Sequence, residues 1–311
     1  MSDSTIDGLP KARGMLAERF PLAPLTRFKT GGEAEVFFAP ADIDDLSRFL
    51  KKAPKDMNVH ALGFGSNILI RDGGLSGITV QLKSERFSAI EHDPDGKKLK
   101  CGAFASNMAI AKLALEKSIA GMEFLFGIPG SIGGSAITNA GCCGAELKDI
   151  LVSIETVNAQ TGEKGVMSAA ECGFGYRSSL IPAGLIITSA TLAGTEGNAA
   201  EIEKKMNAIR DKKDKSQPTY TKTAGSVFKN PEGRLAWQLI RDAGCQGMRI
   251  GGAAISPVHA NFIVNESDAT SADIEDLADK VRGAVYEKFG ITLEYEMKIV
   301  GSRKAEGPEI A

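Results

Sequence analysis

The spacing of apolar residues gives the clearest structural signal in the C-terminal part of the chain. There, Ile274, Leu277, Ala278, Val281, Val285 and Phe289 recur at helical intervals and define one face of a predicted helix. Thr270 or Ser271 can cap its start, and Gly290 can end it in a left-handed turn. From Ile291 to Ile299 apolar residues alternate with polar ones, which predicts a strand with one buried face.

Shorter stretches of the same two patterns predict a mixture of helices and strands along the rest of the chain. Helices are predicted within residues 1–25 and at Ile43–Leu50, Met108–Ser118 and Glu201–Asp214. Strands are predicted at Glu33–Ala39, Ile78–Leu82, Leu151–Val157 and Leu185–Ala193, and Val59–Ile70 is predicted as two strands around a turn. Residues Thr221–Gly233 are expected to form a loop around a short strand. The sequence therefore predicts a small α+β unit over roughly residues 26–82, followed by a second unit of helices and strands.

Composition and charge limit the function classes that fit this pattern. The chain has 311 residues, enough for about two domains, and a hydrophobic fraction of 43% that is ordinary for a globular protein. Its formal net charge is −2 and it has no basic stripe, so we expect neither a nucleic-acid partner nor attachment to a membrane surface. We find no apolar leader and no stretch approaching the ~20 apolar residues that span a bilayer, so a cytoplasmic location is expected.

Cysteines and histidines give no sign of a disulfide framework or a metal centre. The five cysteines are Cys101, Cys142, Cys143, Cys172 and Cys245, and no pair has CxxC spacing. We expect reduced thiols, and the adjacent Cys142 and Cys143 are not expected to bridge readily. The three histidines lie far apart in the sequence, without a cluster of cysteines or carboxylates, so no metal site is expected.

Two glycine-rich segments are candidates for binding a phosphate-bearing ligand. Gly127–Gly141 has five glycines in fifteen positions, and such a segment lets successive backbone amides point at one anion. Pro129 and the lack of a preceding strand distinguish it from the GxGxxG fingerprint. Gly63–Asn67 is a second turn of this kind, so the two segments together can hold two parts of one ligand. The alternatives are a tight turn in a packed core for the first segment and a hairpin turn for the second.

Four residues carry side chains suited to catalysis. Arg177 lies among small residues and can reach a carboxylate or phosphate, although without further context the pattern favours a surface arginine in a loop. Ser226 lacks the second glycine of a nucleophile elbow, which leaves a proton-donor role or a turn cap. Glu294 and Glu296 share the polar face of the last predicted strand, and periodicity does not choose between them.

Taken in order, these segments resemble the UDP-N-acetylenolpyruvoylglucosamine reductase family. The resemblance covers about residues 26–301 and rests on seven motifs: TRFKTGGEAE, LGFGSNILIRDGGLSG, GMEFLFGIPGSIGGSAITNAG, FGYRSS, QPTYTKTAGSVFKNP, IGGAAISPVHANFIVN and LEYEMKIVG. It implies a two-part FAD-binding domain of the vanillyl-alcohol-oxidase type, followed by a C-terminal α+β substrate-binding domain. On this basis we expect an N-terminal leader and helix at 1–25, FAD-binding subdomains at 26–82 and 83–197, a substrate-binding domain at 198–302 and a tail at 303–311.

The resemblance also implies which residues bind the ligands. FAD is expected to be held without a covalent link by Gly63, Phe64, Gly65, Ser66, Asn67, Ile68, Gly127, Ile128, Pro129, Gly130, Ser131, Gly133, Gly134, Ala136 and Asn139. Tyr176, Asn230 and His259 are expected to contact the substrate. For Tyr176 core packing stays open as the alternative, and for His259 a satisfied polar position beside a loop.

The implied reaction reduces UDP-N-acetylglucosamine enolpyruvate to UDP-N-acetylmuramate, a step of peptidoglycan precursor synthesis, with NADPH as hydride donor and FAD as carrier. Negative charge develops beside the substrate carboxylate, so the reaction needs cationic or hydrogen-bonding groups and an acid. By the resemblance Ser226 is the proton donor, and Arg177 and Glu296 stabilise the enolate. The spacing between Arg177 and Ser216 resembles the shorter subtype of the family, which lacks a loop whose tyrosine covers the substrate. We expect a monomer.

Two other functions remain open on the sequence. A different flavin oxidase or dehydrogenase would share the glycine-rich segments but has no need for Arg177, Ser226 and Glu296 together. A non-catalytic nucleotide-sugar-binding protein would keep the glycine-rich segments and could lose the acid. A yellow protein that releases flavin on denaturation is the observation that separates an enzyme from this last alternative.

Overall fold

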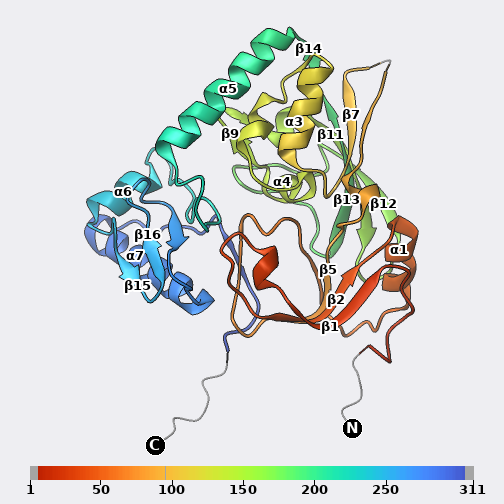
Figure 1. The fold of residues 1–311 in the computed structure, drawn as a ribbon, viewed down its shortest axis with the longest axis horizontal. Helices are drawn as coiled ribbons and strands as arrows, with labels where there is room; N and C mark the ends of the chain where they lie inside the picture. Colours follow the sequence, from red (N-terminus) through yellow and green to blue (C-terminus); the bar gives the residue numbers. More distant parts are fainter. Residues whose placement is uncertain (1–5, 95, 305–311) are drawn as a thin grey trace, which may run out of the picture. The chain divides into compact units, whose positions relative to one another are not determined.

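The structure, a computed structural model, describes residues 6–94 and 96–304, which form two compact units (Figure 1). Unit 1 contains the residues up to Glu18, Val36–Phe64 and Gly77–Lys213. Unit 2 contains Arg19–Glu35, Gly65–Ser76 and the residues from Asp214 onward. Residues 26–35 and 65–76, which the sequence assigned to the first FAD-binding subdomain, therefore lie in the same compact unit as the C-terminal segment. Which ligand each predicted segment binds stays a prediction.

Unit 1 is built around a five-stranded antiparallel sheet with the order β12-β11-β13-β7-β6. Its strands are β6 (Ile90–His92), β7 (Lys98–Gly102), β11 (Leu151–Asn158), β12 (Lys164–Ser168) and β13 (Leu185–Ala193). Helices α3 (Asn107–Glu116) and α4 (Ile132–Thr138) pack against β7 and β13 on one face of this sheet (Figure 1). Leu99, Ile154 and Leu192 are fully buried between these layers, because alternate residues of each strand face the helices.

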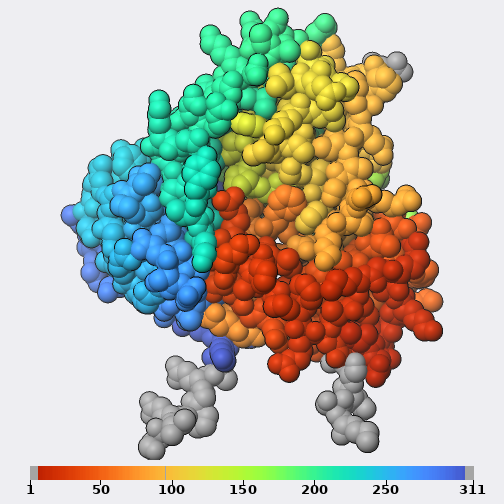
Figure 2. All heavy atoms as spheres, in the orientation of Figure 1, coloured from red at the N-terminus to blue at the C-terminus, as the bar shows by residue number. Residues whose placement is uncertain are grey.

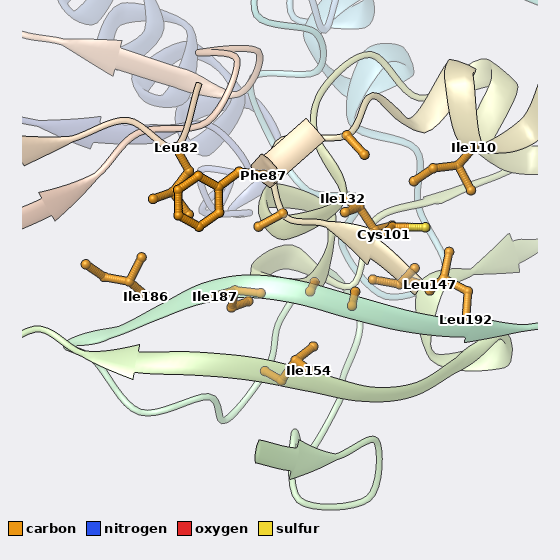
Figure 3. Packing of buried hydrophobic residues seen from close by; sticks show 14 of the residues in the cluster. Leu82, Phe87, Cys101, Ile110, Ile132, Leu147, Ile154, Ile186, Ile187 and Leu192 are labelled. Atoms are coloured by element: carbon orange, nitrogen blue, oxygen red, sulfur yellow. The ribbon is translucent and has the colours of Figure 1, made fainter. Parts of the chain in front are cut away.

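The core of unit 1 consists mainly of aliphatic side chains, with several phenylalanines among them. Figure 3 shows Ile110, Ile132, Ile154 and Leu192 converging from helices and strands onto this common interior. A second sheet has the order β1-β2-β5-β3, with strands β1 (Met15–Pro21), β2 (Glu33–Ala39), β3 (Val59–Ala61) and β5 (Leu75–Val80), and the residues of β1, β2 and β5 are divided between the two units. Helix α1 (Ile43–Lys52) buries Leu46, Phe49 and Leu50, and the short helix α2 (Glu85–Ser88) buries Phe87 in the same core.

Short elements complete unit 1. These are the two-stranded pairs β8 (Ile119–Ala120) with β14 (Thr195–Glu196) and β9 (Gly141–Cys142) with β10 (Ala145–Glu146), and single 3-10 turns at Glu123–Gly127 and Leu147–Asp149. Helix α5 (Ala199–Ser216) is strongly charged and turns only Ile202, Met206 and Ile209 inward. Most of its other residues are exposed, as its composition predicts, and Figure 2 shows this segment on the outside of the face that it draws.

Unit 2 joins a long helix to a small antiparallel sheet. The strands β15 (Arg249–Ile250), β16 (Ala253–Ile255) and β17 (Ile263–Asn265) pack against α7 (Ser271–Phe289), and α6 (Ala236–Asp242) also contacts this helix (Figure 1). Thr270 caps α7 through a hydrogen bond from the Asp273 amide, and Gly290 ends it with a φ of 68°. A parallel pair links β4 (Ile68–Ile70) to β18 (Lys298–Val300). The predicted C-terminal helix and both of its ends are confirmed.

Two predictions at the ends of the chain are wrong. Within the described part of residues 1–25, the chain forms strand β1 and a 3-10 turn at Ala23–Leu25, where a helix was predicted. From Ile291 to Met297 the chain is irregular except for one bridge at Tyr295, and only Lys298–Val300 is a strand. Leu293 and Met297 are nevertheless buried. The alternating pattern therefore identified the buried side correctly, but the backbone of this segment pairs only briefly, with residues 227–229 around a single bridge, and forms no extended strand there.

One central segment also differs from its prediction, and another contains a helix that the sequence did not predict. Residues Thr221–Gly233 contain no strand, only bridges from Ser226 to Phe262 and from Phe228 to Tyr295. The glycine-rich segment includes the helix α4, although its glycines disfavour helix. A Cβ atom on Gly133 would lie 3.0 Å from both the Cβ and the carbonyl oxygen of Ala103. Glycine at this position lets the helix lie close against the neighbouring backbone.

An ion pair inside unit 2 gives a test of the fold. Arg71 holds Glu275 with two hydrogen bonds of 2.8 and 2.9 Å, and this contact places the pKa of Glu275 below its ordinary value of 4.5. We expect Glu275→Gln to lower the free energy of unfolding at neutral pH by roughly 1–3 kcal/mol. A carboxyl group whose pKa is lowered by folding stabilises the fold at pH values above its ordinary pKa. This stabilisation is lost as the pH falls through the lowered pKa of the folded state. Chemical denaturation should therefore show that the difference in unfolding free energy between the unmodified chain and Glu275→Gln becomes smaller below pH 4.5.

The control for this prediction is Glu287→Gln on the same helix, where the side chain is exposed. It should leave stability unchanged at every pH. An equal loss of stability in both variants would contradict the role given to the Arg71–Glu275 pair.

Candidate active site

The loop Gly63–Asn67 presents a row of backbone amides. None of its five amide N–H groups donates a hydrogen bond within the described part of the chain. Two of its carbonyls accept hydrogen bonds instead. The Gln81 side-chain amide donates to the Gly63 carbonyl, and the Arg27 backbone amide donates to the Gly65 carbonyl. Gly65 has a φ of 60°, and a Cβ atom there would lie 2.3 Å from the Leu25 carbonyl oxygen. The loop is thus fixed through its acceptors while its donors stay available to a ligand.

This loop is not a hairpin, which removes the alternative left open by the sequence. Strand β3 before it pairs in parallel with β5, whereas β4 after it pairs in parallel with β18. The loop therefore connects strands of two different sheets. The chain also passes from unit 1 to unit 2 between Phe64 and Gly65.

The first part of the second glycine-rich segment has the same character. The amides of Gly130, Ser131 and Gly134 donate no hydrogen bond within the described residues, while Asn107 donates to the Ile128 carbonyl and to the Ser135 hydroxyl. The two segments meet inside unit 1, since a Cβ atom on Gly63 would lie 2.8 Å from the Ser131 hydroxyl oxygen. Small residues with unused amides suit a diphosphate, whose oxygens accept hydrogen bonds. These residues fit the pyrophosphate of a dinucleotide such as FAD.

Arg177 is held in a defined position within unit 1. It has a φ of 51°, and its side chain is only 20% exposed, so it is not a freely solvated loop arginine. Its guanidinium donates to the Gly141 carbonyl at 3.0 Å and lies 3.6 Å from a Glu146 carboxylate oxygen. The ring of Tyr176 lies 5.2 Å from the guanidinium carbon. The hairpin of β9 and β10 therefore positions this cation.

Asn139 connects Glu146 to the segment that carries Arg177. Its side-chain amide donates to Glu146 at 3.0 Å and to the Gly175 carbonyl at 2.9 Å, and its carbonyl accepts from the Lys148 amide. Asn139 has a left-handed backbone with a φ of 44° and ends helix α4. Sequence reasoning missed Glu146, because nothing in the sequence links it to a residue 31 positions away.

Ser226 and Glu296 lie on neighbouring segments of unit 2. The Glu296 amide donates to the Val227 carbonyl at 2.8 Å, and Ser226 itself bridges to Phe262. Gly225 precedes the serine with a φ of 85°. The half-buried Ser226 hydroxyl makes no hydrogen bond within the residues that the structure describes, so it does not act as a turn cap. It is available to donate to a ligand.

The structure distinguishes the two carboxylates that periodicity left equivalent. The Glu294 side chain is 75% exposed and pairs with Lys229 at 3.4 Å, as expected of a solvated surface residue. Glu296 is half-buried, and its carbonyl accepts a hydrogen bond of 3.1 Å from the Asn67 side chain. The glutamate thus lies next to the end of the Gly63–Asn67 loop. This placement favours Glu296 over Glu294 as the functional carboxylate.

The three predicted substrate contacts occupy different settings. Tyr176 is 49% exposed, so it is not a core residue. Asn230 accepts a hydrogen bond from the Ala236 amide at the start of α6. His259 is half-buried beside Phe262 and Trp237, and burial lowers its pKa below 6.5, because the charged imidazolium is disfavoured there. Its Nδ1 accepts from the Asn261 amide, which leaves Nε2 as the donor of a neutral ring.

The predicted site residues therefore fall into two groups. Gly63, Phe64, the residues 127–139, Tyr176 and Arg177 belong to unit 1, whereas Gly65–Ile68, Asn230, His259, Ser226 and Glu296 belong to unit 2. Within unit 2 the structure brings Ser226, Glu296 and Asn67 together. The role of each residue stays a prediction. No helix among the described residues is both long and apolar enough to cross a membrane.

Comparison with known proteins decides the family. The family model described as "UDP-N-acetylenolpyruvoylglucosamine reductase, C-terminal domain" matches residues 217–300. The family model of an FAD binding domain matches residues 34–167. The chain is 46% identical over 302 residues to the UDP-N-acetylenolpyruvoylglucosamine reductase of Parvibaculum lavamentivorans, covering 97% of this chain and 96% of the relative. This chain belongs to that family.

Other members of the UDP-N-acetylenolpyruvoylglucosamine reductase family agree in sequence and in structure. The enzyme of that name from Sphingopyxis alaskensis is 45% identical over 298 residues, covering 96% of this chain and 98% of the relative. The crystal structure of UDP-N-acetylenolpyruvylglucosamine reductase from Thermus caldophilus matches with a TM-score of 0.79 and 31% identity, covering 93% and 99% of the two chains. The predicted family, the α+β class and the FAD-binding domain are confirmed, and the chain is an FAD-dependent oxidoreductase.

Proposed function

We propose that this protein reduces UDP-N-acetylglucosamine enolpyruvate to UDP-N-acetylmuramate, a step of peptidoglycan precursor synthesis, with NADPH as the electron donor. The observation that carries the proposal lies in unit 2. There the Ser226 hydroxyl makes no hydrogen bond within the described residues, and the next residue, Val227, accepts a hydrogen bond from the Glu296 amide. Asn67, at the end of the Gly63–Asn67 loop, donates to the Glu296 carbonyl. A proton donor, a carboxyl group and part of a cofactor loop are thus built into one unit.

Bound FAD supplies a two-electron carrier between the nicotinamide and the enolpyruvyl double bond. The amides of Gly63–Asn67 and of Gly130, Ser131 and Gly134 hold its pyrophosphate. The chain's side chains act on the substrate. Ser226 donates a proton to the carbon beside the substrate carboxylate, and Arg177 and Glu296 hold that carboxylate as negative charge develops.

The remaining predicted contacts orient the sugar nucleotide. His259 acts as a neutral hydrogen-bond donor rather than a cation, because burial lowers its pKa. Asn230 retains its side-chain amide as a donor while its carbonyl accepts from Ala236. Tyr176 lies beside the guanidinium of Arg177 and extends the surface presented to the substrate.

Two rival functions are weakened by particular observations. A different flavin enzyme has no reason to place, beside Glu296, a serine whose hydroxyl makes no hydrogen bond within the described residues. A non-catalytic nucleotide-sugar-binding protein has no need for an FAD-binding domain, which matches residues 34–167 of this chain. The preference for NADPH, the monomeric state and the cytoplasmic location stay predictions.

A turnover assay tests the proposed function. Purified protein carrying FAD should oxidise NADPH only when UDP-N-acetylglucosamine enolpyruvate is added, and the sugar nucleotide should become heavier by two hydrogen atoms. NADPH oxidation that depends on oxygen and ignores the sugar nucleotide would indicate a flavin oxidase. Binding of the sugar nucleotide without turnover, in a protein that takes up no flavin, would support the non-catalytic alternative.

A further inference from the structure

The turn between β9 and β10 brings two thiols together. Cys142 ends β9, and Cys143 and Gly144 form a two-residue connection to Ala145, which pairs with Cys142. Cys143 has a φ of 55° and Gly144 a φ of 91°, which is the left-handed geometry that tight hairpins require. Side chains of adjacent residues in a regular strand point to opposite faces. Here the left-handed Cys143 turns its side chain back, and the two sulfur atoms lie 3.4 Å apart.

The two thiols differ in accessibility. Cys143 is exposed, whereas Cys142 is half-buried against the glycine-rich segment, since a Cβ atom on Gly127 would lie 2.9 Å from its sulfur. Burial raises the pKa of Cys142 to about 11, so this thiol is mostly protonated at neutral pH. Cys143 is therefore the thiol that meets a reagent from solution first. Cys142 lies within contact distance to react with it afterwards.

The same hairpin positions the proposed catalytic cation. The Gly141 carbonyl, directly before Cys142, accepts from Arg177 at 3.0 Å. Glu146, at the end of β10, lies 3.6 Å from the same guanidinium. A change in the shape of this turn thus acts directly on two of the groups that hold Arg177.

We propose that Cys142 and Cys143 form a reversible oxidation site, at which a peroxide converts the two thiols to a disulfide between adjacent residues and thereby displaces Arg177. In the first step Cys143 is oxidised to a sulfenic acid and the peroxide is reduced, with release of one water when it is hydrogen peroxide. In the second step the Cys142 sulfur attacks the Cys143 sulfur, the S–O bond breaks, and a second water leaves with the Cys142 proton. The effect on catalysis rests on the proposed role of Arg177.

Geometry predicts that this disulfide is strained and easily reduced. The sulfur atoms must approach from 3.4 Å to about 2.05 Å, which the present turn does not allow without rotation of its backbone. Adjacent Cα atoms are about 3.8 Å apart across a trans peptide, below the usual disulfide range of about 4.4–6.8 Å. Strained and exposed disulfides have more oxidising potentials and are the labile ones. The bridge is therefore unsuited to a structural role and suited to reversal by a thiol reductant.

The test uses the full chain carrying FAD, treated with hydrogen peroxide and then alkylated under denaturing conditions. Trypsin releases residues 118–148, a peptide whose only cysteines are Cys142 and Cys143. We expect this peptide to lose two hydrogen atoms and to resist alkylation, with both effects reversed by dithiothreitol. Turnover should fall by about tenfold or more after peroxide and recover with the reductant, because displacement of a catalytic group by ~1 Å has effects of this size.

Variants and a second probe make the test specific. Cys143→Ser should keep normal turnover in peroxide, whereas Cys245→Ser, at a buried thiol elsewhere, should remain as sensitive as the unmodified chain. Phenylarsine oxide binds two neighbouring thiols with loss of water. The reduced protein should therefore retain this reagent, whereas the Cys143→Ser variant should not bind it. Oxidation of Cys143 to a sulfinic acid with Cys142 still free would overturn the site. Formation of the disulfide with unchanged turnover would overturn its link to Arg177. The peptide mass and the binding of phenylarsine oxide do not depend on the proposed substrate.

Discussion

Replacing Ser226 by alanine should lower turnover of the enolpyruvyl substrate by roughly 100- to 10,000-fold, the range by which a positioned acid accelerates proton transfer. The hydroxyl has no hydrogen-bond partner within the described part of the chain, so its removal leaves no buried group unsatisfied. The fold and FAD binding should therefore be unchanged. Reduction of the enzyme by NADPH should also proceed at the normal rate, since Ser226 takes no part in that half of the reaction.

The measurement is a pair of rapid-mixing experiments on Ser226→Ala, one for each half of the catalytic cycle. Ser267→Ala, an exposed serine of the same unit, serves as the control and should behave like the unmodified chain in both. A variant that slows both halves equally would indicate a structural defect. Unchanged turnover in Ser226→Ala would remove this residue from the mechanism.

Replacing Glu296 by glutamine should lower turnover by roughly 100-fold, comparable to the loss of one electrostatic contact to a developing charge. Glu296 is half-buried beside Ser226 and Asn67, whereas Glu294 is 75% exposed and paired with Lys229. The same substitution at Glu294 should therefore have almost no effect on turnover. Both variants keep the size of the side chain and the backbone bonds that connect this segment to its neighbours.

Steady-state kinetics on the two glutamine variants measure this difference. The two residues are two positions apart in one segment, so Glu294→Gln controls for any general effect on local structure. A larger loss in Glu294→Gln than in Glu296→Gln would show that the register of this segment had been misread. Equal and small losses would indicate that neither carboxylate acts on the substrate.

The sequence predicted most of the regular elements because their signals are local. Helix α7 has both an apolar face and matching caps, and the strands β2 and β13 begin and end at the predicted residues. The helix predicted within residues 1–25 failed because pairing with β2, not local propensity, makes Met15–Pro21 a strand. Likewise, the pattern over residues 291–297 reports burial correctly but says nothing about which backbone lies opposite.

The candidate site was predictable in part for the same reason. Glycine-rich segments are visible in the sequence, and within the described residues the amides of Gly63–Asn67 and of Gly130, Ser131 and Gly134 donate no hydrogen bond. The supports of Arg177 were not visible, because Gly141 and Glu146 are brought to it by a hairpin that no local pattern predicts. The choice between Glu294 and Glu296 also depended on burial, since their spacing gives both the same expected face.

The most direct test of the account is an anaerobic experiment on the flavin itself. Protein carrying FAD is reduced with NADPH, the excess is removed, and UDP-N-acetylglucosamine enolpyruvate is added while the visible absorbance of the flavin is followed. We predict that the absorbance disappears with NADPH and returns rapidly with the enolpyruvyl sugar nucleotide, and that it returns far more slowly in Ser226→Ala. A flavin that stays reduced until oxygen is admitted would contradict the proposed function.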